Sequence, residues 1–345
     1  MVKMPSKPSL RAHIAGWHER FAAIAFGVAL ALTAALPAHA ADASKGKKIA
    51  LLVSQTTTPY VAAFDNAFQA RLPTYGMELT VFAAMYDAAL QAQQIDDAIA
   101  RKFDLLVVMA VGESAVVPAL ARAKEAGIPV IMVNNVPKDG TEELYVTFVG
   151  QDQVAMGRLA ADAVLKGMKT SGREGGKVAM ITGFLSSGAS IRRVAGFREA
   201  IKANPKVEIV ATEDGRWDTA TSEKLAGQLY ARFAGAGGLD AVYGMADNQA
   251  VAAISAAEAA GIQVGYQSSK QLLVIGGNCL KEGIDSLKAG KLYSTLSQIP
   301  TDLGVKAADT VNDYFSGQKL PKQVLMPVEM ITKENVAQWE SKCTY

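Results

Sequence analysis

The sequence predicts an α/β fold in which parallel β-sheets are covered by helices on both faces. Short apolar runs recur along the chain, and stretches with helical spacing lie between them. The runs are continuous rather than alternating, which is typical of strands that are buried on both sides of a parallel sheet. From Val178 onward a second series of alternating strands and helices is predicted. The length of the chain allows two domains of roughly 150 residues each.

In the first half, the predicted strands are residues 48–53, 79–82, 105–109, 130–133 and 146–149. A helix is predicted over 61–72, because Phe64 and Phe68 lie four residues apart on one face. A second helix is predicted over 88–103, with Leu90, Ile95 and Ile99 facing inward.

In the second half, each predicted strand directly precedes a predicted helix. The strands are 178–181, 207–211, 241–243 and 272–275, and the helices are 189–203, 218–233, 247–260 and 282–287. The glycine-rich stretches 171–176 and 235–238 are predicted to be surface turns.

The segment 1–40 has the pattern of a signal peptide. A basic leader over 1–20 is followed by an apolar run over 21–36, and then by Ala38 and Ala40 at the −3 and −1 positions of a cleavage site. This run is short for a membrane span, which needs about 20 apolar residues. We therefore expect export to the periplasm with cleavage near Ala40, which leaves the mature chain 41–345. An uncleaved membrane anchor is the alternative.

Charge and composition exclude several functions. The formal net charge is +2, but beyond position 40 there are 31 basic and 32 acidic residues, so no positive surplus is available for nucleic acid. All three histidines (His13, His18 and His39) precede position 41, which excludes histidine-dependent catalysis and histidine metal sites in the remainder.

Motifs for cofactors and phosphates are also missing. The chain has no Gly-x-Gly-x-x-Gly, no phosphate-binding P-loop and no Gly-x-Ser-x-Gly, and its two cysteines stand 64 positions apart. The sequence therefore predicts a protein that is not an enzyme and that uses no cofactor and no metal.

Polar residues are concentrated where the predicted strands end. The stretches are 54–60, 110–114, 134–137, 183–193, 216–219, 246–249 and 277–280. Ligands of open parallel sheets bind outside the carboxyl ends of the strands. Serine, threonine and amide side chains there, with Tyr60 and Trp217 among them, suit a neutral polyhydroxy ligand. The alternative for each polar residue alone is that it caps the following helix.

Four stretches resemble the ribose-type periplasmic sugar-binding proteins, the soluble receptors of ABC importers. They are 49–61, 126–135, 192–201 and 296–304, and the similarity runs in family order over residues 47–331. The resemblance implies two doubly wound lobes with flavodoxin-like strand order, joined by three crossovers and closing on a ligand cleft between them. The N-terminal lobe would comprise 41–151 plus 299–329, and the C-terminal lobe 152–298 plus 330–345.

The resemblance also implies the ligand contacts. These are Ser54, Thr58, Tyr60, Met109, Asn134, Asn135, Ser190, Arg193, Trp217, Asp247, Asn278 and Gln298. Tyr60 and Trp217 would stack on the two faces of the sugar, and Gln298 would be the hinge glutamine. The alternative for the two aromatic side chains is packing in the core, because both residue types also fill interiors.

This chain departs from the ribose pattern at its charged positions. Asn134 and Asn135 stand where ribose binders carry Asp-Arg, and Asn278 replaces an aspartate. Met109 replaces an asparagine, and the more usual ligand arginine of the 191–193 stretch is Ile191 here. Arg193 remains as the nearest cation, and we expect it to support the site. We therefore expect a neutral pentose, deoxy sugar or polyol rather than ribose bound in the usual manner.

Two other protein classes share this fold. A chemotaxis or signalling receptor would use the same clamp and is not separable by sequence. A repressor would begin with a helix-turn-helix module of about 60 residues, where this chain has its apolar leader. The expected partners are the sugar and the membrane permease of an importer, with no nucleic acid, and the expected state is a monomer.

Export would place Cys279 and Cys343 in an oxidising compartment, and their even number fits pairing in a disulfide. Two separate thiols, one of them buried, are the alternative.

Overall fold

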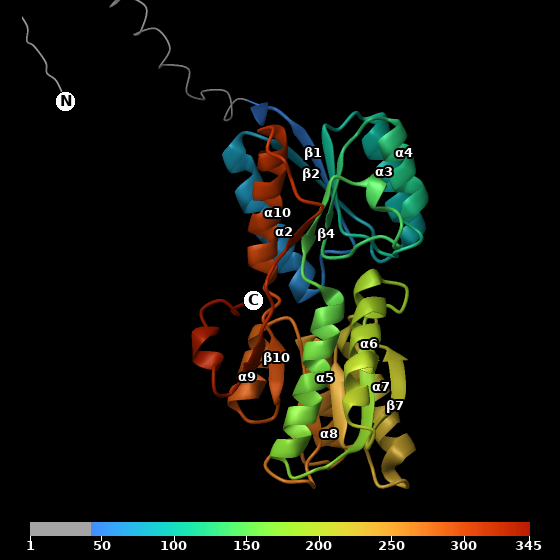
Figure 1. The fold of residues 1–345 in the computed structure, drawn as a ribbon, viewed down its shortest axis with the longest axis vertical. Helices are drawn as coiled ribbons and strands as arrows, with labels where there is room; N and C mark the ends of the chain where they lie inside the picture. The colour runs from blue at the N-terminus through green and yellow to red at the C-terminus, as the bar shows by residue number, and fades with distance from the viewer. Residues whose placement is uncertain (1–42) are drawn as a thin grey trace, which may run out of the picture. The chain divides into compact units, whose positions relative to one another are not determined.

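The computed structural model describes residues 43–345, which form two six-stranded sheets (Figure 1). The first sheet has the order β11-β5-β4-β3-β1-β2, and all of its pairs are parallel. Its strands are β1 (Lys48–Val53), β2 (Glu78–Ala83), β3 (Leu105–Val108), β4 (Val130–Val133), β5 (Thr147–Gly150) and β11 (Gln323–Leu325). The order of β1 to β5 is the flavodoxin-like one, so the predicted fold class is confirmed.

The second sheet repeats this plan with the order β12-β10-β9-β8-β6-β7. Its strands are β6 (Gly176–Thr182), β7 (Val207–Asp214), β8 (Ala241–Gly244), β9 (Leu273–Ile275), β10 (Ser294–Leu296) and β12 (Met330–Thr332). Only β12, at the edge, runs antiparallel to its neighbour β10 among the described strands of this sheet.

Helices cover both faces of each sheet (Figure 1). Those of the first sheet are α2 (Pro59–Arg71), α3 (Ala88–Ala100), α4 (Val117–Glu125) and α10 (Pro300–Phe315). Those of the second sheet are α5 (Gln153–Thr170), α6 (Gly188–Ala200), α7 (Thr219–Ala234), α8 (Asp247–Ala259) and α9 (Lys281–Lys288). Short 3₁₀ turns are η1 (Leu72–Tyr75), η2 (Glu142–Leu144), η3 (Ile201–Ala203) and η4 (Val336–Gln338). None of the helices within 43–345 is long and apolar enough to span a membrane.

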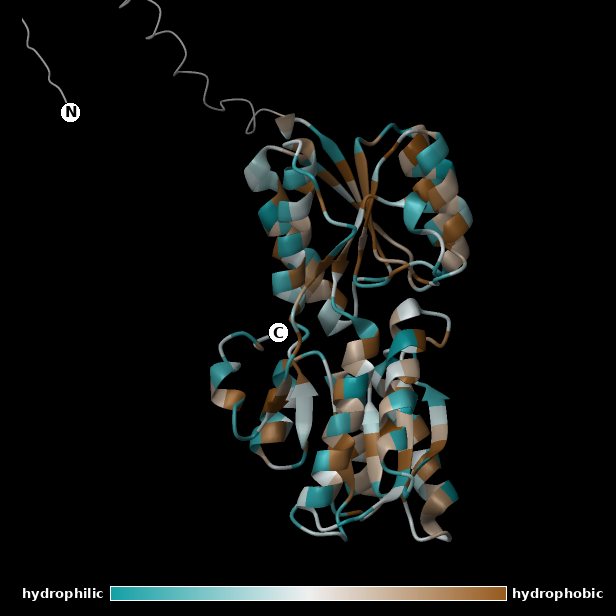
Figure 2. Ribbon diagram, in the orientation of Figure 1, coloured by the Kyte–Doolittle hydropathy of each residue, from teal (hydrophilic) through white to brown (hydrophobic). Residues whose placement is uncertain are grey.

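The continuous apolar strands explain the layers. In β1, Ile49 and Leu51 pack toward Phe64 and the other side chains of α2 and α10, whereas Leu52 packs toward α3 and α4 on the opposite face. Successive strand residues point to opposite faces, so a strand that is buried on both sides must be apolar at every position. Figure 2 shows hydrophobic residues concentrated along the strands of the first sheet.

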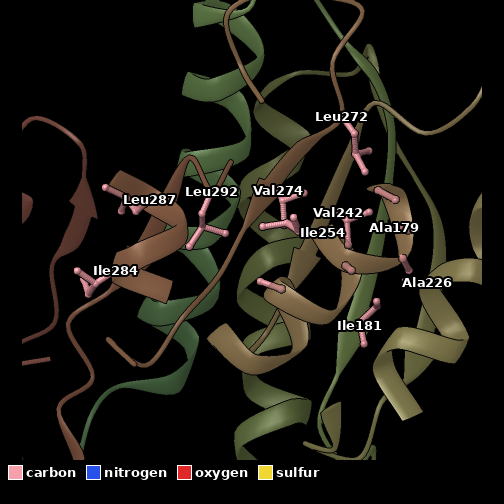
Figure 3. Close-up of a cluster of buried hydrophobic side chains, with 14 of the residues drawn as sticks. Ala179, Ile181, Ala226, Val242, Ile254, Leu272, Val274, Ile284, Leu287 and Leu292 are labelled. Carbon is pink, nitrogen blue, oxygen red and sulfur yellow. The ribbon is translucent and has the colours of Figure 1, made fainter. Parts of the chain in front are cut away.

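The core of the second sheet is built in the same way. On one face, Val242 and Val274 pack with Ile254 of α8 and Leu287 of α9 (Figure 3). On the other face, the Tyr243 and Phe197 rings stack with centroids 5.2 Å apart. Full burial of a side chain of this kind contributes about 1.5–3 kcal/mol, so these layers hold the strand ends in fixed positions.

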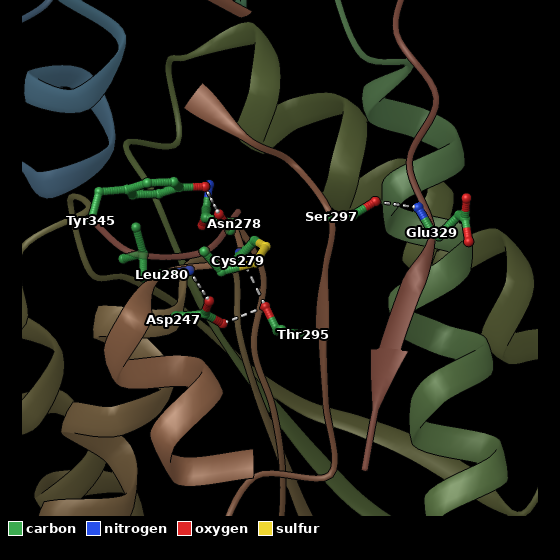
Figure 4. Close-up of a disulfide and its surroundings, with 9 residues drawn as sticks. Asp247, Asn278, Cys279, Leu280, Thr295, Ser297, Glu329 and Tyr345 are labelled. Atoms are coloured by element: carbon green, nitrogen blue, oxygen red, sulfur yellow. Dashed lines mark hydrogen bonds between the residues drawn. A yellow bond between two sulfur atoms is a disulfide. The ribbon is translucent and has the colours of Figure 1, made fainter. Parts of the chain in front are cut away.

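The chain passes between the sheets three times, after β5, after β10 and after β11. The second and third crossings are tied together: Ser297 N donates to Glu329 O at 2.9 Å, and Glu329 N donates to Ser297 Oγ at 2.7 Å (Figure 4). The fold therefore has the three-stranded hinge that the resemblance implies.

The predicted elements all occur, with ends that shift by a few residues. The helix predicted from residue 61 begins at Pro59, because a proline fits the first turn of a helix. The helices α4, α5 and α10 and the strands β10, β11 and β12 were not predicted from the sequence. Each of these strands has three residues, which is too short to show a periodicity. The predicted signal peptide, residues 1–40, lies outside the described residues.

Candidate ligand-binding site

A cavity lies where the carboxyl ends of the strands of both sheets face each other. It encloses about 570 Å³ of space not filled by protein atoms, including its opening. Its walls are formed by Ser54, Thr58, Pro59, Tyr60, Val61, Tyr86, Met109, Ala110, Val111, Asn134, Asn135, Ser187, Ala189, Arg193, Trp217, Ala246, Asn248, Asn278 and Gln298. Residues from both sheets and from the second crossing contribute, so one bound molecule would contact both halves of the described chain.

Aromatic side chains supply three of these walls. Tyr60 stands in the first turn of α2, and Trp217 follows β7. The indole lies so close to Gly183 that a Cβ atom at that position would overlap it, so glycine is required there. Tyr86, after β2, packs against Phe184 of the other half with ring centroids 4.4 Å apart and ring planes tilted by 39°. Flat apolar faces of this kind suit the C–H surface of a sugar ring.

Arg193 is the centre of a hydrogen-bond network beneath the cavity. Its Nε donates to Gln153 Oε1 at 2.7 Å, its Nη1 to Met245 O at 2.9 Å, and its Nη2 to Gln298 Oε1 at 2.7 Å. Its guanidinium also lies 5.6 Å from the centroid of the Trp217 ring. The Arg193 side chain is buried, and this desolvation lowers its pKa. Because its acceptors come from α5, from the end of β8 and from the second crossing, Arg193 ties the hinge to the second sheet.

Gln298 continues the network to the first sheet. Its Nε2 donates to Asn134 Oδ1 at 3.0 Å and to Gln151 Oε1 at 3.3 Å, and its Oε1 accepts from Asn278 Nδ2 at 2.9 Å. A single side chain at the crossing therefore orients Asn134 and Asn278, which line the cavity from opposite sheets.

The cavity is polar but nearly uncharged. Among the described residues that line it, Arg193 is the only ionised side chain, and no carboxylate is present. Three buried oxygens of the lining have no hydrogen-bond partner: Thr58 Oγ1, Asn135 Oδ1 and Asn278 Oδ1. Buried polar atoms are nearly always hydrogen-bonded in native proteins, so these oxygens are available to the hydroxyl groups of a ligand.

The backbone around the cavity is strained. Tyr86, Asn134, Trp217 and Asn278 adopt positive φ angles of 58°, 58°, 59° and 91°. Such conformations cost about 1–3 kcal/mol each and cluster at functional sites, where the surrounding structure enforces them. All four residues line the same cavity, which supports it as the functional site.

The structure brings ten of the twelve predicted contact residues to the cavity. The other two are buried outside its wall. Ser190 Oγ accepts from Ser187 Oγ at 3.1 Å, so Ser187 is the serine that lines the cavity. Asp247 accepts from Leu280 N at 2.8 Å and from Thr295 Oγ1 at 2.6 Å, and its burial raises its pKa to about 8.

Three further polar or aromatic side chains line the cavity beyond the predicted contacts: Tyr86, Ser187 and Asn248. Ser187 and Asn248 lie within the polar stretches 183–193 and 246–249, in which Ser190 and Asp247 are the predicted contacts. Tyr86 follows the edge strand β2, whose carboxyl end lies at the same sheet edge but outside the predicted polar stretches.

A disulfide joins Cys279 to Cys343 beside this site, with their Cα atoms 5.1 Å apart (Figure 4). Cys279 follows Asn278 in the chain, so the disulfide is anchored one residue from the cavity lining.

Comparisons with known proteins agree with this fold. The family described as "Periplasmic binding protein domain" matches residues 49–319. The ribose import binding protein of Escherichia coli (strain K12) is 24% identical over 316 residues, which cover 92% of this chain and 99% of that protein.

Two solved structures extend the comparison. An ABC transporter solute binding protein from Agrobacterium vitis with bound D-fucose has a TM-score of 0.77 and 28% identity, over 86% of this chain and 100% of that one. A second, from Bacillus halodurans with bound myo-inositol, has a TM-score of 0.77 and 25% identity, over 87% and 99%. Because the family match covers well over half of the sequence, the chain belongs to the periplasmic binding protein domain family, a family of binding proteins rather than enzymes.

Proposed function

We propose that this chain is the solute-binding protein of an ABC importer and that it binds one neutral sugar or polyol. The observation that carries the proposal is a cavity between two sheets with aromatic walls and unpartnered neutral oxygens. Relatives that are described as binding ribose, D-fucose and myo-inositol support the class of ligand.

Within that class, the ligand is a pentose, a deoxy sugar or a polyol. The bound molecules named for the two solved relatives, D-fucose and myo-inositol, are a deoxy sugar and a cyclic polyol. Met109 adds an apolar patch to the wall, and its sulfur lies 3.7 Å from Ser54 Oγ. This patch suits a C–H or methyl group better than a hydroxyl group.

The ligand is neutral, because Arg193 already donates to three protein oxygens. A carboxylate or phosphate group that is removed from water needs charged or several strong donors. Asn134 and Asn135 provide only neutral amides, and each already uses part of its amide group in bonds to Gln298 or to Ala110 O.

Ligand binding stabilises a closed state of two lobes, residues 41–151 plus 299–329 and residues 152–298 plus 330–345. Tyr60 belongs to the first of these and Trp217 to the second, so a ligand contacts both only when the lobes are close. The ligand shifts the population toward closure by this difference in affinity. The closed form of the monomer is then the one that the membrane permease recognises.

The proposal includes export to the periplasm by the signal peptide that the segment 1–40 predicts. The family of the described residues is a periplasmic one, which supports this location.

Thermal-shift screening against pentoses, hexoses, deoxy sugars and polyols tests the function, because a ligand that binds only the folded state raises Tm. Hits are then measured by calorimetric titration, beside a uronate and a sugar phosphate. We expect neutral compounds to bind, and we expect Tyr60→Leu to weaken their binding. Tyr314→Leu is the control, because Tyr314 lies outside the cavity lining. Tight binding of the uronate or the sugar phosphate, without binding of any neutral compound, would overturn the proposal.

A further inference from the structure

The segment 277–281, which leads from β9 to the first residue of α9, carries the lining residue Asn278 and is here called the Asn278 loop. Asn278 donates from Nδ2 to Gln298, and its Oδ1 is unpartnered at the cavity. Asn278 and Cys279 have successive positive φ angles of 91° and 57°. L-residues rarely adopt this conformation, and two in a row persist only where other groups enforce them.

Groups in the interior hold the loop from one side (Figure 4). Leu280 N donates to Asp247 Oδ2 at 2.8 Å, and Cys279 N donates to Thr295 Oγ1 at 3.3 Å. Thr295 in turn donates to Asp247 Oδ1 at 2.6 Å. These bonds fix the backbone N–H groups of the loop, but they leave the carbonyl of Asn278 free.

Residues 343–345 hold the loop from the other side. Cys343 is bonded to Cys279, and Tyr345 O accepts from Lys281 N at 3.0 Å. The Tyr345 hydroxyl donates to Asn278 O at 3.1 Å, as Figure 4 shows. Burial raises the pKa of Tyr345, so its hydroxyl remains a proton donor at neutral pH. Segment 343–345 therefore attaches to the loop at Asn278, Cys279 and Lys281.

We propose that Tyr345, with the Cys279–Cys343 disulfide, positions Asn278 for ligand binding. The inference rests on the proposed function, because Asn278 contacts a ligand only if the cavity is the binding site. The Tyr345 hydroxyl fixes the peptide group between Asn278 and Cys279, and the rotation of that group sets where the Asn278 side chain points. Neither Tyr345 nor Cys343 lines the cavity, so both act through Asn278.

The test compares two variants that each lose one tyrosine hydroxyl bonded to a backbone carbonyl. Tyr345→Phe removes the bond to Asn278 O, and Tyr230→Phe removes the bond from Tyr230 to Ala253 O at 2.8 Å, away from the cavity. Calorimetric titrations use D-fucose and myo-inositol. Hydrogen–deuterium exchange of the peptide that covers residues 277–281 is measured without ligand.

We expect Tyr345→Phe to raise Kd about 3- to 10-fold, the range of one net hydrogen bond, and to speed exchange in the Asn278 loop. Tyr230→Phe should leave both unchanged, although it lowers Tm. The double variant Cys279→Ser with Cys343→Ser should raise Kd at least as much as Tyr345→Phe.

If Tyr345→Phe binds ligand with the same Kd as the wild type, the positioning role is overturned, whether or not exchange in the Asn278 loop is faster. If the wild-type protein binds neither compound nor any other in the screen, the proposed function fails and the positioning role fails with it. The two failures are distinguishable, because the positioning role fails alone when the wild type binds a compound and Tyr345→Phe binds it equally well.

Discussion

Arg192 binds Glu113 across the two halves of the described chain, with 2.9 Å between Nη1 and Oε2. Arg192 stands on α6 beside the second sheet, whereas Glu113 follows β3 of the first. The Arg192 Nη2 also donates to Pro137 O at 3.2 Å and to Asp139 Oδ1 at 2.7 Å. The side chains of Arg192 and Glu113 are only 16% and 19% exposed, so water screens this pair less than the surface pairs. The contact exists only while the two halves are close.

The first prediction is that Glu113→Gln weakens ligand binding about 3- to 10-fold without touching the cavity, because it removes a partly buried ion pair of the closed state. Titration calorimetry measures Kd, and small-angle scattering should show a larger radius of gyration for the variant with ligand at subsaturating concentration. Added salt should weaken the wild type more than the variant.

Asp139→Asn is the matched control for that pair. The Asp139 carboxylate also binds Arg192, but it is 90% exposed, so its loss should change Kd less than twofold. Equal changes in Kd for Glu113→Gln and Asp139→Asn would contradict the prediction that the Arg192–Glu113 ion pair stabilises the closed state because it is partly buried.

The second prediction concerns Trp217. Ligand should change the tryptophan fluorescence, because beyond position 40 the chain has only Trp217, in the cavity wall, and Trp339, which packs against the core of the second sheet. Trp217→Ala should weaken binding at least tenfold, or by about 1.4 kcal/mol. Trp339→Phe should leave the ligand-induced change in place. Unaltered affinity in Trp217→Ala would refute the stacking role.

The third prediction is a stability effect of the disulfide. It joins cysteines at a sequence separation of 64, and closing a loop of this length stabilises the fold by about 4 kcal/mol in the chain-entropy model. Cys279→Ser with Cys343→Ser should lower the free energy of unfolding, measured by denaturant titration at equal pH. Mass spectrometry of the unreduced protein should find no thiol that can be alkylated, and two such thiols would disprove the bond.

The fourth prediction is a pH dependence that Asp247 causes. Its folded-state pKa is raised from 3.8 to about 8, first of all by burial. Between these values the folded state holds a proton that the unfolded state has released. Asp247 therefore contributes most to stability below pH 3.8, and the contribution falls by at most about 1.4 kcal/mol per pH unit as pH rises to about 8.

Asp247→Asn keeps the shape of the side chain and removes the titration. Denaturant titrations from pH 5 to 9 should show a flatter loss of stability in the variant than in the wild type. The charge of Glu282 adds to the raised pKa of Asp247, and burial raises the pKa of Glu282 itself. Glu282→Gln is therefore the control that separates the titration of Glu282 from that of Asp247. Parallel curves for Asp247→Asn and the wild type would contradict the assignment.

Much of the candidate site could be predicted from the sequence, because it depends on which residues directly follow each strand. Each apolar run predicts a strand, parallel strands end at a common edge, and polar residues just after them must gather there. Ser54, Met109, Asn134 and Trp217 reach the cavity for this reason. Tyr86 obeys the same rule and could have been found by it.

The rule does not say which neighbour in a loop turns toward the cavity. Asp247 and Asn248 are adjacent after β8, yet only Asn248 lines the wall. The choice depends on Leu280 and Thr295, 33 and 48 residues further along the chain, which supply the hydrogen bonds that hold the Asp247 carboxyl group away from the cavity.

The sequence by itself therefore determined the alternation of strands and helices, the doubly wound class and the sheet edge that carries the cavity, because hydrophobic periodicity and strand direction are properties of short segments. Only the tertiary structure decided that Arg192 joins the two halves while Arg193 supports the hinge, and that Tyr345 lies against Asn278. These roles depend on partners that are distant in the chain, and burial and hydrogen-bond geometry select among them only once the sheets have packed.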